Sequence, residues 1–410
     1  MKRKIADVDV AGRRVLMRVD FNVPLADDDG TMRITDDRRV ALSLPSIRSV
    51  IDRGGRLILM SHLGRPKGTG LEPEFSLGPV AARLQEHLPD TDIHFHSRDC
   101  ADPANREAAA GLTDGAILLL ENLRFNPGEK KGDEAFASAL AALAGEDGIY
   151  CNEAFGTSHR TDASMVAVPR AMGQAPKVAG LLLGKELRFL GQSVEDATAE
   201  PGFVAVLGGA KVSDKLAAIE RLTGRVDDVL VGGAMAYTFL RAKGVATGSS
   251  LVEEGMIEQA EAMLAAAERD PRTTIHLPQD HVCGQALESG TPVEVHGGAI
   301  PDGWMGLDVG PETYTAYSML VSGARTVVWN GPLGAFETPP FDVGTRKVAE
   351  AMASATELGA TTIVGGGDSA AAIAQFGLEE QVSHVSTGGG ASLAVLEGKR
   401  LEAVELLDEG

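Results

Sequence analysis

One pattern of apolar and polar positions recurs along this chain. A short run of β-branched residues or leucines is followed by a glycine-rich or polar loop, and then by an alanine-rich stretch with helical spacing. Uninterrupted apolar strands that alternate with helices are typical of parallel sheets covered by helices on both faces. The pattern therefore predicts a doubly wound α/β architecture that occurs twice. The segments that carry it are 14–22, 56–66, 116–125 and 149–156 in the first half, and 203–211, 228–236, 326–332, 361–369 and 384–392 in the second.

An amphipathic stretch separates the two occurrences of this pattern. Residues 178–195 have apolar side chains at helical spacing, and an acidic, small-residue break follows at Pro201–Gly202. We therefore expect an N-terminal domain of residues 1–177, an interdomain helix of residues 178–195 and a second domain that begins at residue 196. The length of 410 residues agrees with two domains, because a single core stops growing at ~250 to 300 residues.

Composition and charge argue against several classes of function. The formal net charge of −20 would repel phosphate backbones and anionic lipids, and the aromatic content of 4% provides few stacking platforms for bases. The three cysteines are far apart and lack the spacing of a disulfide framework or a zinc site. There is no signal-peptide pattern and no apolar window of ~18 residues. We expect a cytoplasmic protein with no nucleic-acid or membrane partner.

Polar side chains stand at the ends of the first-half strands. In open parallel sheets, ligands bind beyond the carboxyl ends of the strands. Several of these side chains are arginines, whose planar guanidinium group matches a phosphate or a carboxylate with two hydrogen bonds. Their convergence would indicate an anionic substrate, whereas each arginine alone could simply be a solvated loop residue. The side chains concerned are Asp20, Asn22, Arg39, His62, Arg65, Arg124, His159 and Arg160.

The second half offers glycine clusters, a lysine pair and an aspartate at its strand ends. Lys211 and Lys215 follow Gly208–Gly209 and are four residues apart, which predicts both ammonium groups on one side of a helix start, where free N–H groups favour anions. Asp368 follows three glycines at another helix start. An acid beside a phosphate site would be repulsive unless a cation bridged it, so Asp368 indicates Mg²⁺ held mostly by phosphates and water; the alternative is a simple N-cap.

Two motif checks bear on the class of enzyme. The pattern GxxxxGK[ST] is absent, so the chain is not a P-loop protein. Gly365, Gly367 and Ala370 satisfy GxGxxA after a strand, which leaves an NAD-dependent dehydrogenase open as an alternative. That match comes late in the chain, and an acid occupies the turn where the pyrophosphate should lie.

A series of segments spread over the whole chain resembles phosphoglycerate kinases. They are "RVDFNVP", "SHLGRP", "ENLRF", "FGTSHR", "LGGAKVSDKL", "MAYTF", "LDVGP", "WNGPLGAFE", "VGGGDS" and "STGGGASLAVLEGK". The resemblance implies two Rossmann-like domains that face one another across a cleft closed by hinge motion. It also implies that the second domain ends at residue 390 and that residues 391–410 return to the first domain.

The resemblance implies a function and a set of site residues. The function is reversible phosphoryl transfer between 1,3-bisphosphoglycerate and ADP, which gives 3-phosphoglycerate and ATP in glycolysis and gluconeogenesis. The resemblance also implies that the enzyme is a monomer. Asp20 and Asn22 would hold the glycerate moiety, and Arg39, His62, Arg65, Arg124 and Arg160 would clamp its anionic ends. The nucleotide residues would be Lys211, Lys215, Gly233, Asn330, Glu337, Gly365, Gly366, Gly367, Asp368 and Ser369, with Asp368 near Mg²⁺. The catalytic residues would be Arg39, Lys211, Gly366 and Gly389. A catalytically silent scaffold with the same fold is a third possibility.

The sequence departs from the family pattern at a few positions. Asp162 stands in place of a second histidine after "FGT", which would weaken the electropositive wall near Arg160. Ala234, Gln279 and Ser369 also differ from the family. A separate feature is the acidic excess of 58 Asp and Glu over 38 Lys and Arg, which we interpret as adaptation to salt, with ordinary acidic solubility as the alternative.

Overall fold

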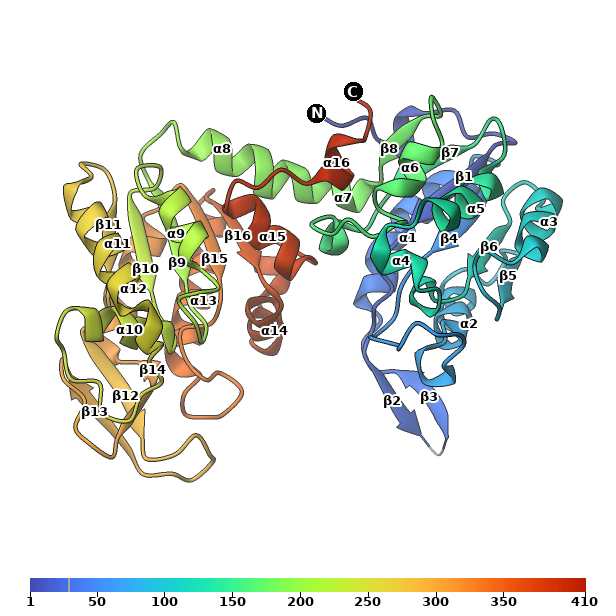
Figure 1. Ribbon diagram of the computed structural model, residues 1–410. Helices are drawn as coiled ribbons and strands as arrows, with labels where there is room; N and C mark the ends of the chain where they lie inside the picture. The colour runs from blue at the N-terminus through green and yellow to red at the C-terminus, as the bar shows by residue number, and fades with distance from the viewer. Residues whose placement is uncertain (29) are drawn as a thin grey trace. The chain divides into compact units, whose positions relative to one another are not determined.

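The computed structural model describes residues 1–28 and 30–410, and the chain divides into two compact units. The first comprises residues 1–187 and 400–410, and the second comprises residues 188–399. The expected domain limits were at residues 177, 195 and 390. The first unit limit, at residue 187, falls inside the expected interdomain helix, and the second, at residue 399, lies nine residues after the expected limit. Each unit is built around its own parallel sheet, which confirms the predicted α/β class (Figure 1). Among the described residues, none of the helices combines the length and the apolar composition needed to span a membrane.

The first unit has a six-stranded sheet in the order β5-β6-β4-β1-β7-β8, in which every neighbouring pair is parallel. A separate antiparallel pair, β2 and β3, lies outside this sheet. The strands are β1 (Arg14–Arg18), β2 (Leu25–Asp28), β3 (Thr31–Ile34), β4 (Arg56–Met60), β5 (Ile93–His96), β6 (Ile117–Leu120), β7 (Ile149–Asn152) and β8 (Lys177–Ala179). The α-helices are α1 (Arg38–Ile51), α2 (Gly78–His87), α3 (Pro103–Gly111), α4 (Gly128–Lys131), α5 (Glu134–Ala144), α6 (Ala167–Ala171), α7 (Leu181–Glu186) and α16 (Glu402–Glu405). Short 3₁₀ turns are η1 (Ile5–Asp7), η2 (Pro73–Phe75), η3 (Leu123–Phe125) and η4 (Phe155–Thr157).

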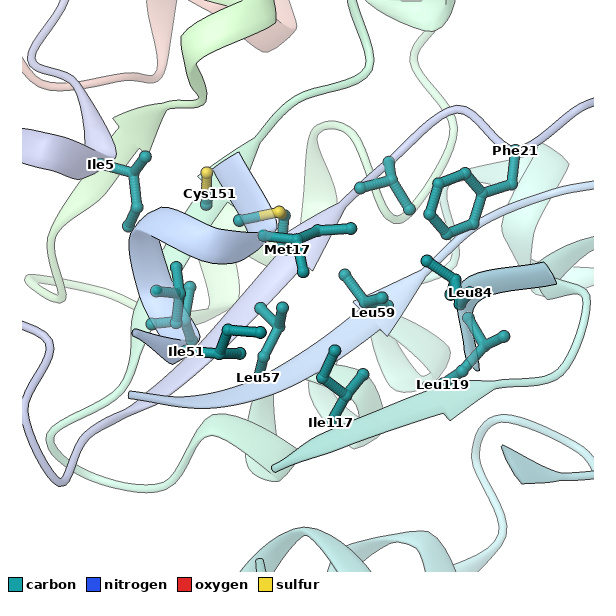
Figure 2. Close-up of a cluster of buried hydrophobic side chains, with 14 of the residues drawn as sticks. Ile5, Met17, Phe21, Ile51, Leu57, Leu59, Leu84, Ile117, Leu119 and Cys151 are labelled. Atoms are coloured by element: carbon teal, nitrogen blue, oxygen red, sulfur yellow. The ribbon is translucent and has the colours of Figure 1, made fainter. Parts of the chain in front are cut away.

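The core of the first unit explains why its strands read as continuous apolar runs. Met17, Leu57 and Leu119 lie on one face of the sheet, where Ile51 of α1 and Leu84 of α2 pack against them (Figure 2). The intervening residues Leu16, Ile58 and Leu118 point to the opposite face and are also fully buried. Both faces are therefore covered, as a parallel sheet requires.

The two ends of the chain meet within the first unit (Figure 1). Lys2 and Glu409 form an antiparallel bridge, and the amide of Arg3 donates to the carbonyl of Asp408 over 2.9 Å. The terminal segment 400–410 thus belongs to the first unit, whereas 391–399 belongs to the second.

The second unit repeats the design with the strand order β11-β10-β9-β15-β16-β17, again all parallel. A three-stranded antiparallel sheet, β13-β12-β14, is added to it. The strands are β9 (Phe203–Leu207), β10 (Asp228–Val231), β11 (Thr274–His276), β12 (Asp280–Gly284), β13 (Val293–Gly297), β14 (Met305–Val309), β15 (Thr326–Asn330), β16 (Thr361–Gly365) and β17 (His384–Val385). The α-helices are α8 (Val194–Ala197), α9 (Leu216–Leu222), α10 (Met235–Ala242), α11 (Ile257–Arg269), α12 (Pro311–Ser322), α13 (Val343–Glu357), α14 (Gly367–Gln375) and α15 (Gly389–Leu396), with 3₁₀ turns η6 (Glu254–Met256) and η7 (Glu379–Gln381).

The expected interdomain helix is shorter at its start than the sequence pattern indicated. Residues 177–179 form the edge strand β8, because Val178 and Ala179 pair with β7 and are buried in the sheet. Gly180 precedes the first helical turn, and the helical residues then run through α7, a π-helical stretch (Leu187–Ser193) and α8. Apolar spacing alone did not separate the strand from the helix that follows it.

Candidate active site

The loops that follow β1 and β4 are joined at the carboxyl edge of the first sheet. Because β1 and β4 are parallel neighbours, these loops begin side by side. The amide of Phe21 donates to Ser61 Oγ over 2.9 Å, and the amide of Gly64 donates to Asn22 Oδ1 over 2.8 Å. The side chain of Asn22 therefore fixes one strand-end loop against the other.

Asp20 is the acidic centre of this edge. Its carboxylate pairs with Arg39 from the first turn of α1 and lies 4.0 Å from His62 Nδ1. Burial raises the pKa of Asp20, but the neighbouring His62, Arg39 and Arg18, together with a backbone hydrogen bond, lower it by more, so the pKa lies below its ordinary value. The Asn22 amide adds a hydrogen bond of 3.2 Å to the same carboxylate. Asp20 is thus ionised and orients Arg39.

Arg18, the last residue of β1, is a site residue that the sequence analysis did not assign. Its guanidinium group is fully buried, with Nη2 3.1 Å from His62 Nδ1 and Nε donating to Ser164 Oγ over 2.9 Å. Ser164 in turn donates to the buried carboxylate of Glu129. Burial, together with the charge of Arg18, holds the pKa of His62 well below its ordinary value, so its imidazole is neutral at pH 7. The available sequence signal was a charged residue inside an apolar strand.

Two more of the expected arginines meet at one carboxylate. Arg124 follows β6 and Arg160 follows β7, although β4 and β1 separate these strands in the sheet. Arg160 Nε donates to Asp162 Oδ2 over 2.9 Å, and the same oxygen lies 3.9 Å from Arg124 Nη2. Arg124 Nη1 also donates to the Gly64 carbonyl over 2.7 Å. Two residues expected at this edge are exposed, namely Arg65, which has no partner among residues 1–28 and 30–410, and His159. The structure brings together the other expected residues, which are Asp20, Asn22, Arg39, His62, Arg124 and Arg160.

The second unit has a buried polar pair at the end of β15. Lys215 Nζ donates to Asn330 Oδ1, while Asn330 Nδ2 is buried and has no hydrogen-bond partner within the described chain. Burial lowers the pKa of Lys215, and the carboxylates of Asp214, Asp368 and Glu397 oppose that shift. The partly buried ammonium group of Lys215 and the unused amide donors of Asn330 therefore form a polar centre at the carboxyl edge of this sheet.

Lys211 and Lys215 do not lie on the helix on which they were expected. Helix α9 begins at Leu216, and both lysines are in the loop before it. Glu253 holds this loop, because its carboxylate accepts hydrogen bonds from the amide and the hydroxyl of Ser213. The prediction of a shared helical face was therefore wrong, although both lysines still follow the carboxyl end of β9.

Glycines let three backbone segments approach one another closely at this edge. Gly233 has φ +66°, and a Cβ atom there would lie 2.6 Å from both N and O of Gly209. Gly366 has φ +96°, and its Cβ would come 3.3 Å from Asn330 Oδ1. A Cβ on Gly389 would lie 3.3 Å from the amide nitrogen of Gly367, so α14 and α15 begin next to each other. Exposed amide groups at such helix starts attract anions.

The remaining residues expected in the second unit differ in exposure. Lys211, Glu337, Gly367 and Asp368 are exposed. Ser369 is buried, and its Oγ accepts a hydrogen bond of 2.6 Å from the amide of Gly331. Ser369 therefore supports the loop after β15.

The residues present fit a magnesium ion that arrives with a phosphorylated ligand. Within the part of the chain that the structure describes, no three His, Cys, Asp or Glu side chains are grouped as metal ligands. Asp368 offers one exposed carboxylate in the first turn of α14. Mg²⁺ commonly binds through one or two carboxylates together with substrate phosphates and water.

Cationic side chains and helix N-termini with free backbone N–H groups lie at the carboxyl ends of the parallel strands. This arrangement defines an α/β enzyme that acts on anionic small molecules. The comparison with protein families identifies it further. The family model described as "Phosphoglycerate kinase" matches residues 5–399, and the chain belongs to this family.

Individual relatives agree with the family match. The chain is 52% identical over 411 residues to phosphoglycerate kinase from Rhodopirellula baltica, covering 100% of this chain and 99% of the relative. It is 49% identical over 409 residues to phosphoglycerate kinase from Chlorobium limicola, with complete coverage of both. Among solved structures, phosphoglycerate kinase from Coxiella burnetii matches with a TM-score of 0.86 and 36% identity, covering 99% of this chain and 98% of that one.

These findings confirm the expected family and the phosphotransferase class of the enzyme. They give no support to a dehydrogenase or to a silent scaffold. The GxGxxA match is explained locally, because Gly366 is the left-handed residue between β16 and α14 and Asp368 occupies the helix start.

Proposed function

We propose that this phosphotransferase exchanges a phosphoryl group between 1,3-bisphosphoglycerate and ADP, giving 3-phosphoglycerate and ATP. The observation that carries the proposal is the cluster of cationic side chains at one sheet edge, where Arg39, Arg124 and Arg160 accompany the buried Arg18. Guanidinium groups recognise phosphate and carboxylate with paired hydrogen bonds, and 3-phosphoglycerate carries one of each. The reaction would serve glycolysis and gluconeogenesis.

The first unit would bind the phosphoglycerate. Asp20 and Asn22 would hold its hydroxyl-bearing part, since they are the polar oxygens at the centre of this edge. His62 is neutral and accepts from Arg18, so its Nε2 carries the proton and can donate to a substrate oxygen. The anionic ends of the substrate would be clamped by Arg39, Arg65, Arg124 and Arg160.

The second unit would bind the nucleotide. Lys211 and Lys215 would contact its phosphates, and Asn330 Nδ2 has the unused donor that a nucleotide oxygen could accept from. Glu337 would contact the ribose, as the resemblance implies. The glycines at the strand ends of the second sheet would let the phosphates approach the backbone. The residues assigned to it are Lys211, Lys215, Gly233, Asn330, Glu337, Gly365, Gly366, Gly367, Asp368 and Ser369.

The chemistry needs charge neutralisation and positioning more than proton transfer. A carboxylate acceptor with a pKa near ~4 is already ionised at pH 7, so no general base is required. Arg39 and Lys211 would offset the charge on the transferring group, and the helix starts at Gly366 and Gly389 would direct amide groups to it. Water must be kept from the acyl phosphate, because hydrolysis would destroy it.

Magnesium would enter with the nucleotide and be held by Asp368 together with the phosphates. It would supply charge neutralisation at the phosphate oxygens. We further propose that the enzyme is a cytoplasmic monomer whose partners are these small molecules, in line with the family resemblance.

A coupled assay with one pair of variants tests the proposal. Purified protein is supplied with 3-phosphoglycerate, Mg-ATP and an enzyme that consumes the acyl phosphate, and ADP formation is measured. We expect Arg39→Ala to lower kcat/KM by about 10²-fold or more, as for the loss of a charged transition-state contact. Arg38→Ala is the matched control, because Arg38 pairs with Asp36 and its side chain is 52% exposed. Equal activity in both variants, or no substrate-dependent ADP above a boiled control, would contradict the proposal.

A further inference from the structure

Asp162 is a buried acid in the middle of a cationic site. Its residue exposure is 4%, so its carboxylate is almost entirely buried. One oxygen, Oδ2, accepts from Arg160 Nε at 2.9 Å and lies 3.9 Å from Arg124 Nη2. Asp162 therefore lies between Arg160 and Arg124 and contacts both through one oxygen; we call this arrangement the bracket.

The backbone around Asp162 is fixed independently of the arginines. The amide of Ala163 donates to the Glu129 carbonyl over 2.7 Å, and the amide of Ser164 donates to Glu129 Oε2 over 3.0 Å. The Asp162 carbonyl accepts from the amide of Met165 at 2.9 Å. Glu129 lies in α4, which follows the turn that carries Arg124. The carboxylate is therefore anchored to the same part of the fold as one of the arginines that it faces.

The bracket also has an electrostatic consequence. Burial and the neighbouring charges of Arg160 and Arg18 disfavour the charged form of Arg124, while Asp162 and Glu129 favour it. Arg160 uses its Nε on Asp162, and its two Nη groups have no partner among the residues described. The end of its guanidinium fork that can bind an anion through two parallel hydrogen bonds thus stays available.

We propose that Asp162 is a positioning residue that holds Arg160 beside Arg124, so that both guanidinium groups meet one anionic end of the phosphoglycerate. This inference rests on the proposed substrate site and adds a residue to it. Arg160 has a side-chain exposure of 35%, and without this partner it would sample many rotamers. The advantage of orientation exceeds the loss of one positive charge, because a restrained fork loses less entropy when it binds.

The test is the steady-state kinetics of Asp162→Ala and Asp162→Asn. We expect Asp162→Ala to raise the KM for 3-phosphoglycerate about tenfold, with kcat at saturation within about twofold and the KM for Mg-ATP unchanged. Asp162→Asn should raise the KM about threefold, because its amide oxygen can still accept from Arg160 Nε without the charge. This second variant also preserves the test if the alanine variant folds poorly.

Asp114→Ala is the matched control. Asp114 accepts from Arg56 Nε at 2.8 Å, so it also pairs with an arginine Nε, but this pair is more exposed. Arg56 is the first residue of β4 and therefore lies at the amino end of the strands, away from the site. The loss of Asp114 should leave both KM values unchanged. A substituted Asp162 that altered only the melting temperature would be a structural residue, and the proposal would be overturned.

A double-mutant cycle with Arg160→Ala separates the two proposals. If Asp162 acts through Arg160, adding Asp162→Ala to Arg160→Ala should change the KM by less than about twofold. If Arg160→Ala raises the KM but Asp162→Ala does not, or lowers it, the positioning role is wrong and the substrate site stands. If neither Arg160→Ala nor Arg124→Ala affects the KM, the proposed substrate site itself fails.

Discussion

Replacing Gly233 by alanine should destabilise the carboxyl edge of the second unit's sheet far more than a comparable change nearby. Gly233 lies between β10 and α10 at φ +66°, and the added Cβ would come 2.6 Å from N and O of Gly209 and 2.9 Å from the carbonyl of Pro332. All three contacts are backbone atoms, so no side chain can rotate away. Gly244, just after α10, is the matched control, because it has φ +73° and no atom lies within 4 Å of its Cβ position.

The magnitudes follow from this comparison. The left-handed conformation costs a non-glycine residue ~1 to 2 kcal/mol, and both variants share this cost. Gly233→Ala adds overpacking against the backbone, which costs a further ~1 to 3 kcal/mol. We therefore expect Gly233→Ala to lower the free energy of unfolding by about 2 to 5 kcal/mol and Gly244→Ala by about 1 to 2 kcal/mol. The displaced loop is the one that leads from Gly209 to Lys211 and Lys215.

Tryptophan fluorescence during urea unfolding measures the stability of the relevant unit. The only two tryptophans of the sequence are Trp304 and Trp329, and both belong to the second unit. Under the proposed function, Gly233→Ala should also lower kcat/KM for Mg-ATP at least about tenfold, since small displacements of positioning groups reduce rates strongly. Gly244→Ala should leave it within about twofold. Equal losses of stability and equal kinetics in the two variants would refute the reasoning from close backbone contact.

Two further predictions concern pH and salt. Burial raises the pKa of Glu153 to about 7, so the folded protein keeps a proton that the unfolded chain releases, and stability from this group falls as pH rises from 5.5 to 8. Wild type should lose about 2 kcal/mol more than Glu153→Gln over that range, measured by urea unfolding; parallel pH profiles would contradict it. For salt adaptation, the net charge of −20 predicts that the melting temperature rises by several degrees between about 0.1 and 2 M KCl, as exposed carboxylates are screened. A flat or falling melting temperature would leave the acidic excess to ordinary solubility.

The sequence allowed the polar edge of each sheet to be predicted because parallel strands all end at the same side. Asp20, His62 and Arg124 follow three different strands, and strand position alone was enough to expect them together. The same logic placed Asp368 at the edge of the second sheet, whereas Asn330 was expected there only from the family resemblance. Their partners could not be obtained in this way. Lys215 contacts Asn330 across 115 positions of sequence, and strand position alone does not specify such a side-chain contact.

Local periodicity also failed where two structures have the same apolar spacing. Residues 178–195 read as one amphipathic helix, yet Val178 and Ala179 belong to a strand because β7 offers them a free edge. The lysine pair had the spacing of a helix, but Glu253 binds Ser213 and keeps the segment as a loop. In both cases a partner distant in sequence decided the local conformation, which is how tertiary contacts override propensity.

Asp162 shows how a departure from a family pattern can acquire meaning from its contacts. From the sequence, an acid among arginines could only be expected to weaken the attraction of the site for anions. The structure adds that the acid is buried and shares one oxygen between the two arginines, while the Nη groups of Arg160 are left without a described partner. The negative charge of Asp162 therefore lowers the affinity of the site for an anion, whereas its orientation of Arg160 raises that affinity. Because an ion pair that restrains a long side chain lowers the entropy lost on binding, a site with less positive charge can still bind its anion well. The sign of the KM change in Asp162→Ala decides between these two effects: an increase means that orientation dominates, and a decrease means that charge does.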